Sequence, residues 1–401
     1  MIEFVDRFGV TEEEMSGLLR KACSRGADYG DLYFEHTVQN LITMEEGIVK
    51  ESVKSISLGL GVRAVKGEST GYAFTEDLSP EKMLEAASTA AAIADQPREI
   101  GPVRIESSEF ENHYPIGELT TGTPLERKIA WIREAEKAAS EHDASIARVT
   151  VTLADRLTTV QIATADGRLL RDTRPMLRFV VNAVAERNGN RQIGLTSGGG
   201  RIGNEYFESQ KSPGEIGIDA ARQAALLLDA VDAPAGPMEL ILAPAESGVL
   251  LHESVGHPLE ADFIRKGTSA YTGRVGDKVA SELVTVIDDG TIKNDRGSIN
   301  FDDEGTIPTA TLLIEKGVLK GFMHDRISAE LFDVAPTGNG RRQSFRDPPV
   351  PRMTNTYLAN GSQDPEEIFR STKRGIYCKT FRGGQVDISN GDFVFVPVEA
   401  Y

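Results

Sequence analysis

The chain has 401 residues, a formal net charge of −17 and two cysteines. Its acidity disfavours a nucleic-acid-binding surface, because phosphate contacts require clustered lysine and arginine. No apolar run approaches the ~20 residues that span a bilayer, and the first residues lack a signal-peptide pattern. Two cysteines exclude a disulfide scaffold. We therefore expect a cytoplasmic protein with neither nucleic-acid nor membrane partners.

A first domain is expected over residues 1–100. Its first helix covers residues 11–24, where Thr11 and Glu14 form a capping-box pattern. A second helix begins at Ser79-Pro80, with serine as N-cap and proline at the first helical position. Alternating apolar residues between glycine-containing turns predict strands in between, at residues 31–36, 40–44, 55–65 and 70–74.

Residues 115–232 repeat this order of elements. A helix over residues 123–138 precedes strands at 146–153 and 158–163, and the helix from Ser212-Pro213 parallels the one from Ser79-Pro80. Each copy is expected to pack as a sheet with helices on one face. The run Gly198-Gly199-Gly200 lacks the lysine and serine or threonine of a phosphate-binding loop, so we interpret it as a flexible loop.

A third domain is expected over residues 236–401, after the proline-rich linker 233–237. Residues 238–243 predict a buried strand, and a helix is expected from near Ala245. Several short apolar stretches separated by Gly, Asp and Asn turns predict a β-rich body with this one embedded helix. The whole chain is therefore expected to be α+β, with two repeated sheet-plus-helix domains before a β-rich domain that carries the helix of the motif described next.

That helix contains His252-Glu253-Ser-Val-Gly-His257. Imidazole is a common metal ligand, and a neighbouring glutamate can act as a general base. In zinc proteases with the spacing H-E-x-x-H both histidines share one helix face, whereas five residues at about 100° each turn the second ring roughly 140° away. We therefore expect the helix to unwind or bulge at Gly256, with Pro258 moving His257 out of α geometry, so that both rings converge.

Other residues are candidates for the same site. His324 and Cys378 are candidate third metal ligands, although each is also compatible with a purely structural role. Two polar, glycine- or asparagine-containing stretches are candidate substrate-binding segments, and ordinary turns explain them equally well. The candidate substrate-binding residues in them are Asn339, Arg341, Thr354, Asn355 and Thr356.

The third domain resembles the TldD branch of the TldD/PmbA family of metallopeptidases. The resemblance rests on six stretches that cover most of residues 236–401: 252–263, 267–269, 299–305, 336–342, 351–356 and 383–387. The duplicated region before them fits the first two domains of that family.

The resemblance implies a zinc-dependent peptidase subunit that cleaves short or unfolded peptides, including leader segments, with metal-activated water. His252 and His257 would ligate zinc, and Glu253 would be the general base. It also implies a heterodimer with a TldE/PmbA-like subunit, and a homodimer is the alternative. A non-catalytic peptide-binding subunit remains a second interpretation.

One departure from the family pattern concerns the third metal ligand. Family members continue past the position of Tyr401 into a segment that supplies a cysteine ligand, so we expect a truncated C-terminal end, or a substitute ligand, and weak retention of zinc.

Overall fold

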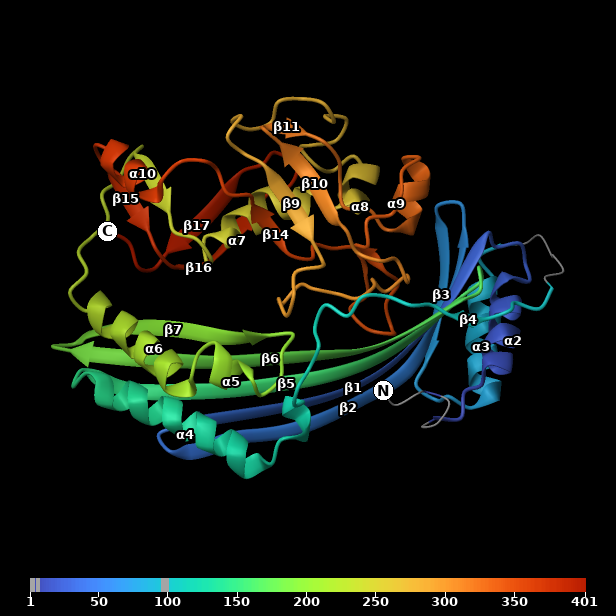
Figure 1. Cartoon of the computed structure of the whole chain (residues 1–401), viewed down its shortest axis with the longest axis horizontal. Coiled ribbons are helices and arrows are strands. Elements are labelled where there is room, and N and C mark those ends of the chain that lie inside the picture. Colours follow the sequence, from blue (N-terminus) through green and yellow to red (C-terminus); the bar gives the residue numbers. More distant parts are fainter. Residues whose placement is uncertain (1–3, 5–7, 95–100) are drawn as a thin grey trace.

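In the computed structural model, which describes residue 4, residues 8–94 and residues 101–401, the two sequence repeats share one sheet (Figure 1). Its strands run in the order β3-β2-β1-β5-β6, and both β7 and the two-residue β4 pair with β6. Their bounds are β1 Tyr29–Glu45, β2 Ile48–Lys66, β3 Ser69–Thr75, β4 Glu106–Ser107, β5 Ile146–Thr164, β6 Arg168–Arg187 and β7 Asn190–Gly200. The fold class is α+β, as predicted.

Each repeat consists of a helix, three antiparallel strands and a further helix. The helices are α2 (Glu12–Cys23) and α3 (Pro80–Ala91) in the first repeat, and α4 (Leu125–His142) and α6 (Pro213–Leu227) in the second. The short α5 (Tyr206–Ser209) and the 3₁₀ turn η1 (Thr120–Gly122) are additions to the second repeat. Antiparallel pairing of β1 with β5 joins the repeats. The domain boundaries expected from the sequence stay a prediction.

Local sequence signals account for several of these elements. Thr11 and Glu14 form the expected capping box of α2, and Ser212 and Glu215 form another at α6. The prediction of a loop at Gly198–Gly200 was wrong, since these residues complete β7 and pair with β6. Gly199 has a φ of +119°, a conformation that favours glycine inside a strand.

The four long helices cover opposite ends of the same sheet face. In β1, Leu32 and Phe34 pack with the core beneath α2 and α3, whereas Ile42 and Met44 join the core beneath α4 and α6. All four occupy alternate positions of one strand, so they point to one side of the sheet. The other face is therefore available to residues 236–401, called here the third part of the chain.

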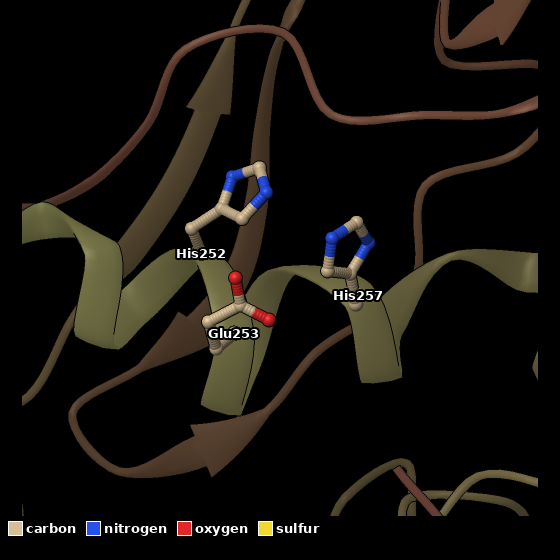
Figure 2. Close-up of side chains that lie close together, drawn as sticks. All are labelled: His252, Glu253 and His257. Atoms are coloured by element: carbon tan, nitrogen blue, oxygen red, sulfur yellow. The ribbon is translucent and has the colours of Figure 1, made fainter. Parts of the chain in front are cut away.

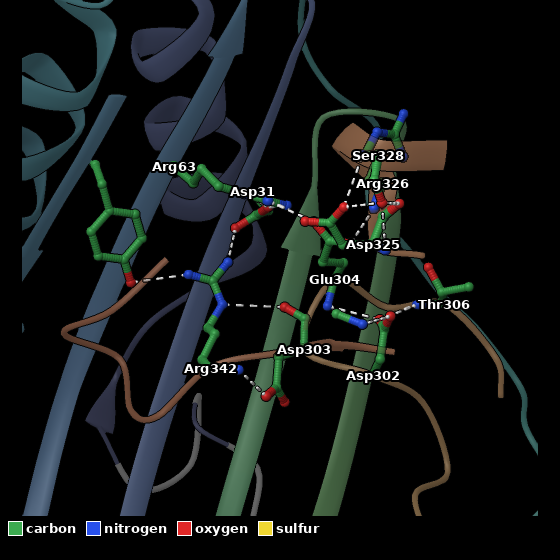
Figure 3. Close-up of polar contacts among 12 residues, drawn as sticks. Asp31, Arg63, Asp302, Asp303, Glu304, Thr306, Asp325, Arg326, Ser328 and Arg342 are labelled. Atoms are coloured by element: carbon green, nitrogen blue, oxygen red, sulfur yellow. Dashed lines mark hydrogen bonds and ion pairs between the residues drawn. The ribbon is translucent and has the colours of Figure 1, made fainter. Parts of the chain in front are cut away.

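The third part contacts that other face through an apolar cluster. It also forms buried ion pairs and hydrogen bonds there, which Figure 3 shows. Phe301 and Phe345 pack against Tyr33, Val160 and Ile162.

Arg63 of β2 is the centre of the ion pairs. Its side chain donates to Asp31 of the neighbouring strand at 2.7 Å and to Glu304 of the third part at 2.6 Å, and all three side chains are at most 1% exposed. Arg342 donates to the second oxygen of Asp31 at 2.6 Å. Residues far apart in sequence are thus held together by charge-assisted hydrogen bonds.

The third part is built from short strands in several small sheets. The larger sheet has the order β11-β10-β9-β14, and three two-stranded ribbons pair β12 with β13, β15 with β8, and β16 with β17. The bounds are β8 Glu239–Leu242, β9 Val286–Asp289, β10 Ala310–Glu315, β11 Val318–Leu319, β12 Gly340–Arg341, β13 Val350–Pro351, β14 Thr356–Leu358, β15 Gly375–Cys378, β16 Phe381–Val386 and β17 Phe393–Pro397.

Two expectations for this region were wrong. Besides the helix of the motif it contains α8 (Ala261–Arg265), α9 (Arg326–Leu331) and α10 (Pro365–Ser371). Asp325 caps α9, and Asp364 caps α10 ahead of Pro365, so the signals for both were present in the sequence. Strand β8 is also largely exposed rather than buried, because β15 is its only strand partner among the described residues. No helix in the described ranges has both the length and the apolar character needed to cross a membrane.

Candidate metal centre

The motif lies on a helical segment that contains three hydrogen-bonding patterns in succession. Helix α7 (Gly248–Leu251) continues into a π-helical turn, η2 (His252–Gly256), and then into a 3₁₀ turn, η3 (His257–Leu259). The backbone N–H of His257 donates to the carbonyl of His252, an i to i+5 bond. A π turn contains one more residue than an α turn, so residues five apart fall on the same side. The predicted bulge is confirmed.

The cause of the bulge differs from the prediction. His257 keeps α-helical angles, φ −55° and ψ −45°, so Pro258 does not move it out of the helical region. Gly256 also has a negative φ of −60° and is needed for space instead: a Cβ there would lie 1.9 Å from Sδ of Met353. The helix begins at Gly248 rather than near Ala245, because Ala245 has a φ of +69°.

The apolar side of this segment anchors it to the third part of the chain. Leu259 is fully buried in a core that includes Leu313 and Leu319, and Leu251 and Val255 pack against the same core. Leu251, Val255 and Leu259 recur every four residues, the spacing of one helix face. The histidines are thereby left on the other side.

Three side chains converge there: His252, Glu253 and His257 (Figure 2). One potential ligand atom from each lies within 4.8 Å of the others, and the two imidazole centroids are 4.5 Å apart with an interplanar angle of 79°. His252 is exposed, whereas Glu253 and His257 are half-buried. Two nitrogens and one carboxylate oxygen form a donor set that suits zinc.

Glu260 orients His257. Its Oε2 lies 3.2 Å from Nδ1 of His257, and its side chain is fully buried. Arg352 donates to the same oxygen at 3.1 Å. The hydrogen bond that Nδ1 of His257 donates to Glu260 raises the pKa of His257. Nδ1 is therefore engaged, and Nε2 is the nitrogen that remains for a metal ion.

Neither residue was expected to support His257: Glu260 had no predicted role, and Arg352 was predicted only as part of the polar stretch 352–356 that could line a substrate cleft. Glu260 follows His257 by three residues, a helical neighbour spacing that offered a signal, whereas Arg352 is brought in only by the fold.

His252 has a different environment. Desolvation of its ring and, secondarily, the nearby charge of His257 lower its pKa. Neutral imidazole is the form that binds a metal. The donor types and their convergence therefore fit a metal ion.

The two candidate third ligands lie elsewhere. Within the described part of the chain, the group that could hold a metal contains neither His324 nor Cys378. His324 is buried, with its Nδ1 3.2 Å from Oγ of Ser328. Cys378 is buried in β15, and desolvation raises the pKa of its thiol. Both residues therefore have the surroundings of structural side chains.

Three of the five candidate substrate-binding residues surround a buried aspartate. Asp288 accepts hydrogen bonds from Nδ2 of Asn339 at 2.7 Å and from the hydroxyls of Thr354 and Thr356, each at 2.7 Å. Asp288 and Asn339 are each 1% exposed. These polar groups are occupied within the chain, and their contact with a substrate stays a prediction.

Asn355 and Arg341, the other two candidates, differ in their hydrogen bonding. Asn355 donates to Ser298 at 2.9 Å and accepts from the N–H of Gly297 at 2.8 Å, so it fixes a neighbouring loop. Arg341 is 28% exposed, and its Nε makes no hydrogen bond, although it lies 3.8 Å from Asp303. Arg341 is thus the candidate with a free donor.

A cavity of about 710 Å³ opens away from the three converging residues. Tyr114, Asp172 and Asn300 are among the residues that line it, and none of the converging residues does. The donor groups are thus at a surface of the third part rather than in that cavity.

Models of the PmbA/TldA metallopeptidase domains match nearly the whole chain. Domain 1 matches residues 30–94, the central domain residues 120–228, and the C-terminal domain residues 235–401.

Individual relatives agree with these matches. The chain is 41% identical to a metalloprotease TldD homologue of Haemophilus influenzae over 94% of this chain and 80% of that protein, and 39% identical to one of Buchnera aphidicola over 98% and 82%. A shorter match, 37% identical over 42% of this chain and 37% of that protein, is to a zinc metalloprotease TldD homologue of Saccharolobus solfataricus.

Solved structures have the same fold. A putative modulator of DNA gyrase from Thermotoga maritima is 22% identical with a TM-score of 0.78, covering 97% of this chain and 89% of that one. TldE from Thermococcus kodakarensis is 20% identical with a TM-score of 0.73, covering 97% and 87%.

Proposed function

Because the chain belongs to the PmbA/TldD metallopeptidase family, we propose that it is a zinc-dependent peptidase subunit that hydrolyses short or unfolded peptides, leader segments included. The observation that carries the proposal is the convergence of donor atoms from His252, Glu253 and His257. Zinc in particular is supported by this donor set and by the zinc metalloprotease among the relatives.

Each residue has a distinct task in this proposal. His252 and His257 hold the ion, which when bound supplies Lewis-acid chemistry. Glu260 and Arg352 keep the His257 ring oriented so that Nε2 faces the site. The carboxylate of Glu253 takes a proton from the attacking water and passes it to the leaving amine.

Replacement of Glu253 tests these assigned roles. Glu253→Gln keeps the shape of the side chain and removes the base, so peptide cleavage should fall by about 10²–10⁴-fold while zinc affinity changes little. Bound zinc and cleavage are measured on the same preparation, with and without a TldE-like subunit. Cleavage at the wild-type rate by Glu253→Gln would contradict the assignment.

A second candidate function is peptide binding by a non-catalytic subunit that presents the peptide to its partner. It is favoured by the donor set, since within the described residues no histidine or cysteine joins His252 and His257. If Glu253 itself completed the coordination, it would no longer be free to act as a base. Stoichiometric zinc that survives dialysis would argue against this candidate, and peptide affinity that survives loss of both histidines would favour it.

A TldE/PmbA-like partner and a cytoplasmic location belong to the same proposal. The likeness to TldE concerns the fold, and a homodimer is the alternative assembly. Sedimentation of the chain alone and with a TldE-like subunit distinguishes the two assemblies.

A further inference from the structure

One face of the central sheet is only partly covered. Residues of β5 and β6 such as Val151, Leu153 and Phe179 point toward α4 and α6 and are fully buried. Residues at the intervening positions point to the face that the third part of the chain contacts. At the end of the sheet whose opposite face is covered by α4 and α6, Thr152 and Ala154 on that face are half-buried rather than buried. A ligand can therefore reach this part of the sheet.

Two exposed arginines lie side by side on that face. Arg156 of β5 is opposite Met176 of β6, and Arg178 stands two residues further along β6. Such diagonal neighbours have Cα atoms about 7–8 Å apart, within reach of one another's long side chains. Like charges at this separation repel each other, so their placement requires an explanation.

A third arginine comes from the third part of the chain. Arg296 lies on a loop that Asn355 holds through the N–H of Gly297 at 2.8 Å and that Asn294 ties to the carbonyl of His113 at 2.9 Å. Burial and then the positive charges of Arg178 and Arg156 lower the pKa of Arg296. The three residues, named here the arginine surface, therefore sense one another's charge.

No carboxylate in the described part of the chain forms an ion pair with this surface, although the charge of Arg156 acts on Glu35 of β1 and partly offsets the rise that burial causes in the pKa of Glu35. Among the described residues, the guanidinium groups of Arg156, Arg178 and Arg296 make neither a hydrogen bond nor an ion pair. Arg174, on the same face of β6, shows the contrast, because Asp172 lies 3.0 Å from it and Asp303 also pairs with it. In a chain of net charge −17, three gathered arginines that form no ion pair are unusual.

A buried arginine contacts the same loop through its backbone. Arg201 is 4% exposed, and its carbonyl accepts from Asn294 of the loop that carries Arg296. Its Nη1 donates to the carbonyl of Pro175 at 3.5 Å, and its guanidinium lies over the ring of Tyr114. Arg201 therefore supports the loop and is not part of the arginine surface.

The arginine surface is also coupled to the candidate metal centre. Asn355 fixes the loop of Arg296, and Met353, two residues earlier, occupies the space beside Gly256. The segment 353–355 therefore contacts the metal-site turn at one end and the arginine loop at the other.

We propose that the arginine surface binds carboxylate groups of peptide substrates, so that the protein prefers peptides with an acidic segment. The proposal rests on the proposed peptidase function for the nature of the ligand. Guanidinium groups bind carboxylates in a bidentate manner, and here they are not already engaged. The carboxylates come from Asp or Glu side chains or from a free C-terminus.

Binding of dye-labelled peptides to the Glu253→Gln protein tests the proposal without depending on cleavage. Three peptides of one sequence are compared by fluorescence anisotropy: Glu side chains with an amidated end, Gln in their place with an amidated end, and Gln with a free carboxylate. We expect the Glu peptide to bind about 10-fold tighter than the amidated Gln peptide at low salt, with the difference shrinking as salt is added. Tighter binding of the free-carboxylate peptide instead would identify the C-terminus as the source.

Removal of the arginine charges is the second half of the test. The Arg156→Gln/Arg178→Gln variant should lose most of the preference, whereas Arg133→Gln, an exposed arginine on α4 across the sheet, should keep it. Equal affinity of all three peptides for the parent protein, or a preference that survives in the double variant, would overturn the proposal. A preference for acidic peptides in a protein that never cleaves them would refute the proposed peptidase function alone.

Discussion

Glu260 lies 3.2 Å from Nδ1 of His257 and is itself fully buried. The carboxylate thus fixes the orientation of the His257 ring, and Arg352 donates to the same carboxylate oxygen. Carboxylate–imidazole pairs of this kind set the tautomer and the orientation of a metal ligand and increase its basicity. The candidate centre therefore extends beyond its three converging side chains.

Removing this carboxylate should weaken metal binding without unfolding the turn. For Glu260→Gln we expect zinc affinity to fall about 10–100-fold, measured by competition with a chelating dye. Asp262→Asn is the control, since it removes the same charge two residues away and Asp262 is 3.9 Å from Arg352. An equal loss of affinity in both variants would mean that charge, rather than ring orientation, is what matters.

A methyl group at position 256 should disturb the π turn. The Cβ of Gly256→Ala would stand 1.9 Å from Sδ of Met353, so overpacking should cost about 1–3 kcal/mol and weaken zinc binding. Thermal unfolding and zinc titration are the measurements.

Gly248→Ala is the matched control on the same helical segment, because nothing lies within 4 Å of its Cβ position and alanine favours the helix. The double variant Gly256→Ala/Met353→Ala should recover part of the loss. An unchanged melting temperature in Gly256→Ala would contradict the role given to Met353.

The bulge was predictable because its signals are local. The spacing of His252 and His257 demanded a departure from α geometry, and glycine between them marked the place. What the sequence did not reveal is the reason for the glycine, since Met353 lies about a hundred residues away and reaches Gly256 only through the fold. The contact of Arg352 with Glu260 was not foreseen for the same reason.

The structure of the two repeats was also only partly predictable from the sequence. Alternation of apolar residues indicated strands in the right regions but divided both β1 and β5 into two strands. A capping box located α2, and Ser212-Pro213 located α6. Alternation does not say which strands are neighbours, so the pairing of β1 with β5 into one sheet was not foreseen. Likewise, the apolar residues of β8 predicted burial, but burial depends on what packs against a strand, and Leu240 is 58% exposed.

Arg63 should be essential for docking the third part of the chain on the sheet. Arg63→Met would leave Asp31 and Glu304 buried without their shared cation, at a cost of about 3–5 kcal/mol. Urea unfolding followed by fluorescence measures the loss. Lys66→Met is the control, because its pair with Asp28 at 3.0 Å is exposed and worth less than about 1 kcal/mol. Similar losses in the two variants would refute the importance of burial.

Acid should loosen the segment that ends at Tyr401. Burial raises the pKa of Glu399, but hydrogen bonds from Arg222, Lys379 and Tyr401 outweigh it and lower the pKa to about 2. A carboxyl with a lowered folded pKa stabilises the folded state above its unfolded value, near 4.3, and this contribution disappears as the pH falls toward 2.

The measurable quantity is the difference in hydrogen exchange between the wild type and Glu399→Gln at the amide of Lys379, which donates to the carbonyl of Glu399 at 2.8 Å. We expect greater protection in the wild type at pH 6, a shrinking difference below about pH 4, and only a small remainder near pH 2. Asp387→Asn, at an exposed aspartate hydrogen-bonded to Ser389, should leave this amide unchanged. A difference that stays constant from pH 6 to pH 2 would show that shape, and not the charge of Glu399, holds the segment against α6.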